Sequence, residues 1–493
     1  MRVALARTVV GLALLLQISA APSLDAETRV WRAPTDPADA VASRGRDVRG
    51  GRCERWVAPG GDDGDAGSAS RPWATLEHAV ERVPDDRCTV WFEDGVYVGH
   101  SEVERGFDTR TTFRAVHRYR AVLESMREVL DIGGASSITF RGFELRHAGP
   151  GASGLVVYMD DRETDHITFR DNIFHDSYDN DLLKILSGPS AIVVKGNVFY
   201  NQGDGEEHID VNGVTNVRIE DNIFFNDFAR SGREDPGSTK HYVVVKDSNA
   251  NEDGRLGSRR VLIRRNVFMN WEGGFESFLV VGLDGKPYLE ARDVRIENNL
   301  LIGNTGNEMD AAFSVYGARD VAFVNNTVVG DLPGREYAFR VDSKDENPRN
   351  RNILFANNIW VDPTGTMEEF SDGEPSNTID LVLDNNLYWN GGSRIPSGEL
   401  VSPLSDDDRH VVRDPGLEAD QSDLVVAFWT GSSFLSGESS IRAEFVRLVM
   451  AYGSIPATSR AVGRALPPQA PADDILGNDR DRRPDLGAFE AAR

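Results

Sequence analysis

The chain has 493 residues, of which 40% are hydrophobic and 27% are charged, and these globular values exclude wholesale disorder. This length exceeds that of one ordinary compact domain but suits a solenoid, which grows by adding coils. The formal net charge of −25 argues against binding to nucleic acid, because phosphate recognition needs a basic surface. The acidity favours either solubility or clusters of Asp and Glu that hold Ca²⁺.

The first 26 residues have the pattern of a signal peptide. Arg2 and Arg7 give a positive start, and a mostly apolar run from Val9 to Ala21 follows. This run is shorter than the roughly 20 residues of a membrane span, and no later segment is apolar enough to cross a bilayer. We expect a secreted or periplasmic monomer with no membrane span, in which residues 27–52 form a linker. An uncleaved N-terminal anchor is the alternative.

The chain contains two cysteines, Cys53 and Cys88. In an oxidising compartment they would form a disulfide. The closed loop of 36 residues would contribute roughly 4 kcal/mol to stability in the chain-entropy model. Two buried thiols are the alternative, and two cysteines alone do not indicate a zinc site.

A short block recurs along the middle of the chain and alternates apolar residues with others, which is the period of a β-strand. The last eight copies end in an asparagine: Asn172, Asn197, Asn222, Asn266, Asn299, Asn326, Asn358 and Asn386. The first two intervals are 25 residues, and the later ones run from 27 to 44 residues. A coil of about 25 residues with variable loops is typical of a parallel β-helix.

The repeated asparagine predicts a ladder at one corner of successive coils. Asn tolerates the left-handed backbone of a tight turn and can form local hydrogen bonds. Stacked on coils about 4.8 Å apart, each amide would bond to the next. A β-sandwich would not keep one asparagine in register through eight units.

The ends of the repeat differ from its middle, as terminal units of a solenoid should. Residues 71–83 predict a short amphipathic helix that caps the N-terminal end of the core, since one face carries Trp73, Leu76, Ala79, Val80 and Val83. We therefore assign residues 53–395 to the β-helix with its cap. Residues 396–493 are assigned to a C-terminal capping or tail region, with a possible helix near residues 440–451.

Three segments near the start resemble the opening motif of secreted β-helix proteins: Trp56-Val-Ala-Pro-Gly-Gly-Asp-Asp-Gly, Pro72-Trp-Ala-Thr-Leu and Asp94-Gly-Val-Tyr. The ending Pro484-Asp-Leu-Gly-Ala-Phe-Glu resembles their closing motif. This group includes alginate lyases, chondroitinase-B-like lyases and pectate lyases. The resemblance implies an all-β, right-handed parallel β-helix with an N-terminal capping helix. It is specific for fold and only weakly specific for activity.

Another short strand precedes each block, and its middle residue should face outward because its neighbours are mostly apolar. Aligning these strands places five residues in one outward stripe: Lys184, Asp210, Lys246, Ser314 and Arg340. A register error of one residue would destroy this arrangement.

The densest acidic cluster of the repeats lies around this stripe, on two consecutive coils. Several oxygen ligands close together suit Ca²⁺. The predicted ligands are Asp179, Asp181, Asp204, Glu206 and Glu207.

This combination of acids and cations suits a polysaccharide lyase, which removes a proton next to a uronate carboxylate and expels the 4-linked oxygen. The main candidate for the base is Lys184, with Lys246 as its rival and His208 as a further catalytic candidate. The predicted substrate-binding residues are Asp210, Arg340 and Tyr242.

The resemblance to alginate and chondroitinase-B-like lyases implies a Lys and an Arg on neighbouring coils. Lys184 matches the Lys loosely, but Glu206-Glu-His-Ile-Asp stands where Arg-His-Gly is expected. The pattern of Ca²⁺-dependent pectate lyases, Asp plus Lys, fits about as well.

Two other functions remain open. One is a non-catalytic carbohydrate-binding or cell-surface β-helix. The other, weaker, is a glycoside hydrolase, which would need two carboxylates about 5–9.5 Å apart. Taken alone, any single Lys or Asp of the stripe is more typical of a residue in a surface ion pair than of a functional residue.

Overall fold

The computed structural model describes residues 53–252, 254, 256–303, 309–330, 339–367, 370–396, 404–418 and 421–492. The expected signal peptide and linker, residues 1–52, lie outside the described part. Among the described residues no helix is both long and apolar enough to span a bilayer.

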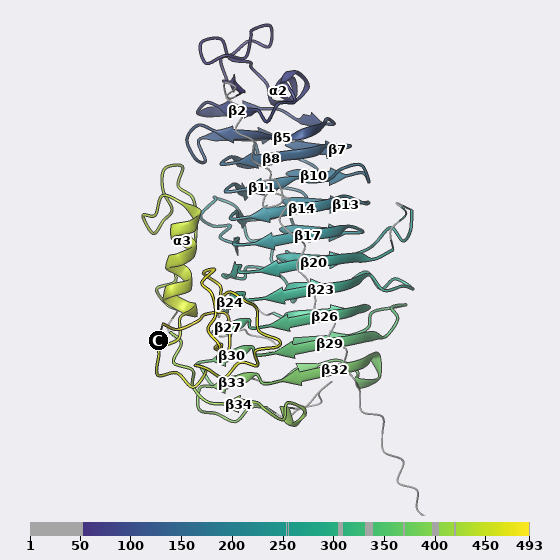
Figure 1. The fold of residues 1–493 in the computed structure, drawn as a ribbon, viewed down its shortest axis with the longest axis vertical. Helices are drawn as coiled ribbons and strands as arrows, with labels where there is room; N and C mark the ends of the chain where they lie inside the picture. Colours follow the sequence, from purple (N-terminus) through teal and green to yellow (C-terminus); the bar gives the residue numbers. More distant parts are fainter. Residues whose placement is uncertain are drawn as a thin grey trace, which may run out of the picture. The chain divides into compact units, whose positions relative to one another are not determined.

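Three parallel sheets run along the described part of the chain, and each coil adds one strand to each sheet, so the fold is a right-handed parallel β-helix (Figure 1). Sheet A consists of β1 (Glu54–Val57), β2 (Thr89–Phe92), β5 (Gly106–Ala115), β8 (Ser136–Arg141), β11 (Thr168–Arg170), β14 (Ser190–Lys195), β17 (Thr215–Glu220), β20 (Ser258–Arg264), β23 (Ala291–Glu297), β26 (Ala318–Val324), β29 (Asn350–Ala356) and β32 (Thr378–Asp384). The predicted fold class is confirmed.

The other two sheets are built in the same way. Sheet B consists of β4 (Ser101–Val103), β7 (Leu130–Gly133), β10 (Val157–Asp160), β13 (Leu183–Leu186), β16 (Ile209–Asn212), β19 (Val243–Lys246), β22 (Ser277–Val281), β25 (Ala311–Tyr316), β28 (Phe339–Asp342) and β31 (Ser371–Asp372). Sheet C consists of β3 (Gly95–Val98), β6 (Ala121–Ser125), β9 (Glu144–His147), β12 (Ile173–His175), β15 (Val198–Tyr200), β18 (Ile223–Phe225), β21 (Val267–Phe268), β24 (Leu300–Ile302), β27 (Thr327–Val329), β30 (Ile359–Asp362), β33 (Leu387–Asn390) and β34 (Val411–Val412).

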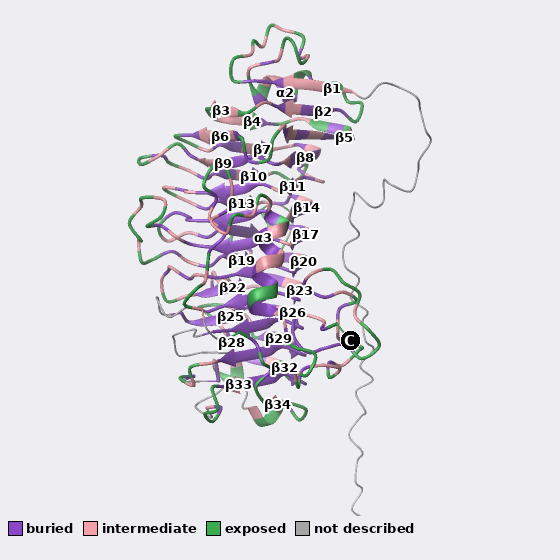
Figure 2. Ribbon diagram, turned by 90° about the vertical axis from the view of Figure 1, so that its left-hand side faces the viewer, coloured by how far each residue is buried: buried purple, intermediate pink, exposed green. Residues whose placement is uncertain are grey.

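The core fills the space between the three sheets, because every second residue of a strand points inward. Figure 2 shows the strands largely buried and the connecting loops more exposed. Identical side chains stack from coil to coil: the rings of Phe174, Phe199, Phe224 and Phe268 follow one another with centroid distances of 4.6, 5.1 and 4.7 Å. Such contacts add stability beyond the burial of their area.

The predicted asparagine ladder is confirmed along its whole length. The Nδ2 of each asparagine donates to the Oδ1 of the next, from Asn172 to Asn386, over 2.9–3.2 Å. The backbone N–H of each also donates to that same Oδ1. Asp407 ends the ladder, since its Oδ2 accepts from both the N–H and the Nδ2 of Asn386 at 2.9 Å.

The conformational reason given for the ladder was wrong. The left-handed residue is the one before each asparagine, for example Asp171 with φ 54° and Asp221 with φ 60°. The preceding residue therefore makes the turn. The asparagine itself is selected because its buried amide both accepts and donates between coils.

The predicted N-terminal helix forms as α2 (Leu76–Arg82), with Thr75 as its N-cap. It lies at the β1 end of the stack (Figure 1), and Leu76, Ala79 and Val80 join the main hydrophobic core. Its role as a cap stays a prediction. Cys53 and Cys88 form the expected disulfide, which joins the starts of β1 and β2.

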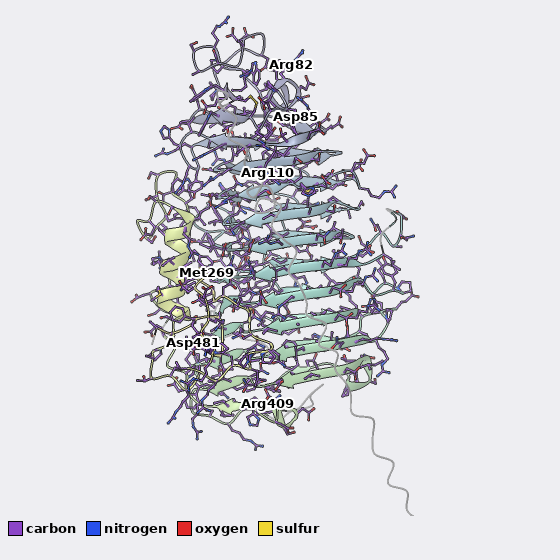
Figure 3. All side chains as sticks on the ribbon, viewed as in Figure 1. Arg82, Asp85, Arg110, Met269, Arg409 and Asp481 are labelled. Atoms are coloured by element: carbon purple, nitrogen blue, oxygen red, sulfur yellow. A yellow bond between two sulfur atoms is a disulfide. The ribbon has the colours of Figure 1, made fainter. Side chains whose placement is uncertain are left out.

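The C-terminal segment does more than close the end. The helix α3 (Ile441–Leu448) continues into η3 (Val449–Gly453) and packs along the outer face of sheet C, where a second hydrophobic core forms. Met269, labelled in Figure 3, belongs to this second core. Within the C-terminal region, β34 pairs in parallel with β33 of the β-helix. Two short 3₁₀ turns complete the elements, η1 (Pro375–Asn377) and η2 (Leu404–Asp406).

Candidate functional site

Sheet B carries the predicted stripe, and its first pair is confirmed. Lys184 on β13 lies opposite Asp210 on β16. Leu183 and Ile185 are buried in the core, as expected, and the Lys184 side chain keeps 22% of its surface exposed. Its Nζ lies 2.9 Å from Asp210 Oδ2 and 3.1 Å from Asp181 Oδ2.

The predicted alignment of Lys246 was wrong by two residues. Val244, not Lys246, lies opposite Asp210, and Lys246 lies opposite Asn212. A shift of two residues keeps a side chain on the same face. The Lys246 Nζ therefore still reaches Asp210 Oδ2 at 3.6 Å, and it lies 3.5 Å from Asp284 Oδ1.

Three buried carboxylates meet beside these lysines. Asp181 precedes β13, Glu207 precedes β16, and one oxygen from each lies within 4.8 Å of an oxygen of Asp210. Asp181 Oδ1 accepts a hydrogen bond from the Glu207 backbone N–H at 2.8 Å. Neither oxygen of Asp210 accepts a hydrogen bond of regular geometry. We call Asp181, Glu207 and Asp210 the acidic triad.

The triad is electrostatically strained, because burial disfavours charged carboxylates that also repel one another. Burial raises the pKa of Glu207 well above its usual range, and the charges of Asp181 and Asp210 add to this effect. Burial also raises the pKa of Asp181, although Lys184 opposes it. Burial and Asp181 raise the pKa of the neighbouring Glu206 to about 7.

The two lysines compensate part of this negative charge. Burial alone would lower the pKa of Lys184, but Asp210 and Asp181 outweigh it and raise that pKa. Asp210 and Glu207 do the same for the pKa of Lys246. The two ammonium groups face two of the three carboxylates closely, and the third, Glu207, has a pKa raised well above its usual range.

The structure brings only part of the predicted metal set together. Asp181 and Glu207 belong to the triad, and Glu206 adjoins it. Asp179 and Asp204 are exposed and act within loops: Asp179 Oδ2 accepts from Gly154 N at 2.7 Å, and Asp204 accepts from the Ser238 hydroxyl. Asp210, predicted to bind substrate, takes their place in the cluster.

His208 and Tyr242 lie inside the coil, away from any substrate. Both are fully buried, and their rings stack at 4.3 Å. The Tyr242 hydroxyl donates to the carbonyls of Met269 and Asn270. Burial lowers the pKa of His208 to about 3. Both residues point inward from the starts of β16 and β19, so neither the His208 side chain, predicted to be catalytic, nor the Tyr242 side chain, predicted to bind substrate, is exposed.

Arg340 faces outward on β28, four strands from Asp210, or about 19 Å along the stack. Its guanidinium pairs with Asp310 at 2.8 Å and with Asp372 at 3.1 Å. Arg340 therefore lies too far from the triad to touch the same sugar.

The loop 229–237, between β18 and β19, packs against the residues that follow β12 and β15. Arg233 Nη1 lies 3.3 Å from Asp176 and donates to the Asn201 carbonyl at 2.9 Å. Its guanidinium also covers the rings of Tyr178 and Phe228, at 4.5 and 5.0 Å.

Sequence reasoning missed Asp284, the second partner of Lys246. No local signal marks it, because it lies in the loop after β22, one coil away from its partner. Only the stacking of coils makes this contact visible.

Solved structures of other proteins resemble this architecture. The structure of pectate lyase Pel9A matches with a TM-score of 0.54 and 15% identity, over 90% of this chain and 97% of that chain. At this identity the likeness shows the fold. XylC in complex with xylose matches with a TM-score of 0.46 and 12% identity, over 89% of this chain and 98% of that chain.

The A-module of a mannuronan C-5 epimerase from Azotobacter vinelandii matches with a TM-score of 0.48 and 12% identity, over 66% of this chain and 91% of that chain. The sequence matches no protein-family model and no curated protein.

Proposed function

We propose that this protein cleaves an acidic polysaccharide by Ca²⁺-assisted β-elimination. The proposal rests on the acidic triad with Lys184 and Lys246 beside it, on consecutive strands of one outward face. Its fold, shared with a pectate lyase, is consistent with a polymeric acidic substrate.

The residues present fit a hard divalent cation. The triad offers only oxygen atoms, and both oxygens of the buried Asp210 lack a regular hydrogen bond. Ca²⁺ prefers several carboxylate oxygens of this kind. Asp181, Glu206, Glu207 and Asp210 would hold it. Bound there, Ca²⁺ would neutralise a uronate carboxylate and make the proton on the adjacent carbon more acidic.

Lys246 is the better candidate for the base. Lys184 is held between Asp181 and Asp210 by contacts of 3.1 and 2.9 Å, so it orients those carboxylates. Lys246 lies on the opposite side of Asp210 with looser contacts of 3.6 and 3.5 Å. A base must be free to reach the substrate proton and must lose its own proton first. A Ca²⁺ ion held by Asp210 and Glu207 would neutralise the two charges that keep Lys246 protonated.

The geometry speaks against an inverting glycoside hydrolase built on the triad. One oxygen of each carboxylate lies within 4.8 Å of the others. The paired acids of inverting glycosidases are about 6.5–9.5 Å apart, which leaves room for a water. A non-catalytic binder remains the alternative function, since it would use the same surface.

Secretion is part of the proposal. The Cys53–Cys88 disulfide supports an oxidising compartment, where such bonds persist. An extracellular or periplasmic location would also give access to polysaccharide. We further propose that the protein acts as a monomer and that nucleic acid is not a partner.

The test is turnover on polygalacturonate, alginate and a neutral galactan, with and without a chelator. A lyase product absorbs in the near ultraviolet through its new C=C bond, a hydrolase product does not, and a binder releases no product. We expect activity on a uronate polymer that the chelator abolishes and Ca²⁺ restores. Cleavage without near-ultraviolet absorbance would refute the elimination mechanism.

Two matched variants separate the lysines. Lys246→Ala should lower kcat by about 10²–10⁴-fold with the fold and Ca²⁺ binding intact, as expected for loss of a general base. Lys184→Ala should instead weaken Ca²⁺ binding, measured by calorimetry. If Lys184→Ala abolishes turnover at saturating Ca²⁺ while Lys246→Ala stays active, the base is Lys184.

A further inference from the structure

Four arginines lie in register on four consecutive strands of sheet A. Arg259 on β20 pairs with Arg292 on β23, which pairs with Arg319 on β26 and then with Arg351 on β29. Neighbouring strands lie about 4.8 Å apart, so the ladder presents one cation per coil over about 14 Å. We call these four residues the arginine ladder. Figure 1 shows the four strands stacked in this order.

Such a ladder is unfavourable in isolation, because like charges directly opposite each other on adjacent strands destabilise a sheet. Another column of the same sheet avoids the problem by alternating sign: Lys195, Glu220, Arg264 and Glu297. There Glu220 contacts Arg264 at 2.9 Å and Lys195 at 3.7 Å. In sheet A, opposite charges therefore alternate in one column, whereas the arginine ladder has four like charges in a row.

The arginine ladder is poorly compensated by its neighbours. Arg319 contacts Asp320 at 3.7 Å, but among the described residues the other three arginines form no ion pair. The Nε of Arg259 is buried without a hydrogen-bond acceptor. The adjoining column contributes Asp293 and Asp320 but also Arg260, so cations outnumber acids on these strands.

The four arginine residues are at least partly exposed to solvent. Arg351 is exposed, the Arg319 side chain keeps 43% of its surface, and Arg259 and Arg292 are partly exposed. The ladder also adjoins the corner with sheet B, since only Gly317 separates β25 from β26. A polymer along the coil axis can therefore lie on the ladder without entering the acidic triad.

We propose that the arginine ladder is a second, non-catalytic binding site for a linear polysaccharide that carries a carboxylate on every sugar. The rise from one coil to the next is of the same order as the length of one sugar, so a chain along the ladder passes about one sugar per guanidinium group. Arg binds carboxylates through paired, charge-assisted hydrogen bonds. The net charge of −25 repels such a polymer over most of the remaining surface, which favours binding at this basic surface.

The kind of polymer that fits the arginine ladder follows from the spacing of its arginines. A polymer in which charged and neutral sugars alternate would place a carboxylate at every second rung only. A homopolymer of uronic acid should therefore bind more tightly per charge. The site does not depend on cleavage, because a protein without lyase activity would bind through it as well.

The test measures binding of polygalacturonate by affinity electrophoresis at low ionic strength, in a Lys246→Ala background and with a chelator present to suppress degradation. The double variant Arg292→Gln/Arg351→Gln removes two rungs without breaking an ion pair, and we expect about tenfold weaker binding, or about 1.4 kcal/mol. Arg292→Lys/Arg351→Lys keeps the charges and should keep most of the affinity. The charge-matched control is Arg118→Gln/Arg120→Gln, in the exposed turn between β5 and β6.

Wild-type binding by the Arg292→Gln/Arg351→Gln variant would overturn the proposal. An equal loss in the Arg118→Gln/Arg120→Gln control would also overturn it, since net charge alone would then explain binding. Equal affinity per charge for hyaluronan, whose charged and neutral sugars alternate, would refute the spacing argument. Concentration-dependent self-association that the ladder variant abolishes would identify the surface as a contact between copies instead. If the wild-type protein cleaves no polymer but ladder-dependent binding persists, the proposed lyase function fails and this inference stands.

Discussion

Asn222, in the middle of the asparagine ladder, offers a quantitative test of what holds the coils in register. Its Oδ1 accepts from the backbone N–H and the Nδ2 of Asn197, at 2.8 and 3.1 Å. Its Nδ2 donates to the Val194 carbonyl at 2.9 Å and to Asn266 Oδ1 at 3.0 Å. The side chain is fully buried, so water cannot replace these partners.

The substitution Asn222→Ala removes all four hydrogen bonds and leaves two buried donors of Asn197 without their acceptor. An orphaned buried polar group costs about 1–3 kcal/mol, and members of a network depend on one another. We therefore expect the free energy of unfolding to fall by about 3–5 kcal/mol. Urea denaturation followed by circular dichroism measures this change.

Asn251→Ala is the matched control, because Asn251 lies in an exposed turn. It should change the free energy of unfolding by less than about 0.5 kcal/mol. If Asn222→Ala costs less than about 1 kcal/mol, the ladder follows from the coil geometry and does not stabilise it.

Three further predictions address the site and its surroundings. The pKa of His175 is raised to about 9, because the Asp176 and Glu144 carboxylates outweigh the effect of burial. The charged His175 therefore contributes fully to stability below about pH 6.5, and this contribution is lost as the pH rises through about 9. Thermal melts should therefore show a larger loss for His175→Gln at pH 6 than at pH 9.5, and an equal loss at both would refute the assignment. Reduction of the Cys53–Cys88 disulfide should lower the free energy of unfolding by about 4 kcal/mol, measured by denaturation with and without reductant. Saturating Ca²⁺, at about 100 times its dissociation constant, should add about 2.7 kcal/mol of stability, and Glu207→Gln should reduce this gain in a thermal-shift assay.

The repeat was readable from the sequence because its signals are local. Alternation of apolar residues marks each strand, and the asparagine that follows marks one corner of each coil. The pairing of Lys184 with Asp210 also followed, because each lies between two apolar residues that align the two strands. The inward direction of His208 and Tyr242 did not follow, because both lie at strand starts where alternation gives no firm phase.

The sequence by itself determined the coil, the ladder and the outward direction of Lys184. Only the tertiary structure decided which charges meet. The 44-residue interval before Asn266 shifted Lys246 by two residues against Asp210 and still returned its Nζ to that carboxylate. The acidic triad, the contact with Asp284 and the arginine ladder likewise join residues from different coils. Loop lengths set which residues of successive coils lie opposite each other. Charges that are then about 5 Å apart attract or repel one another, and this interaction exists only once the coils are stacked.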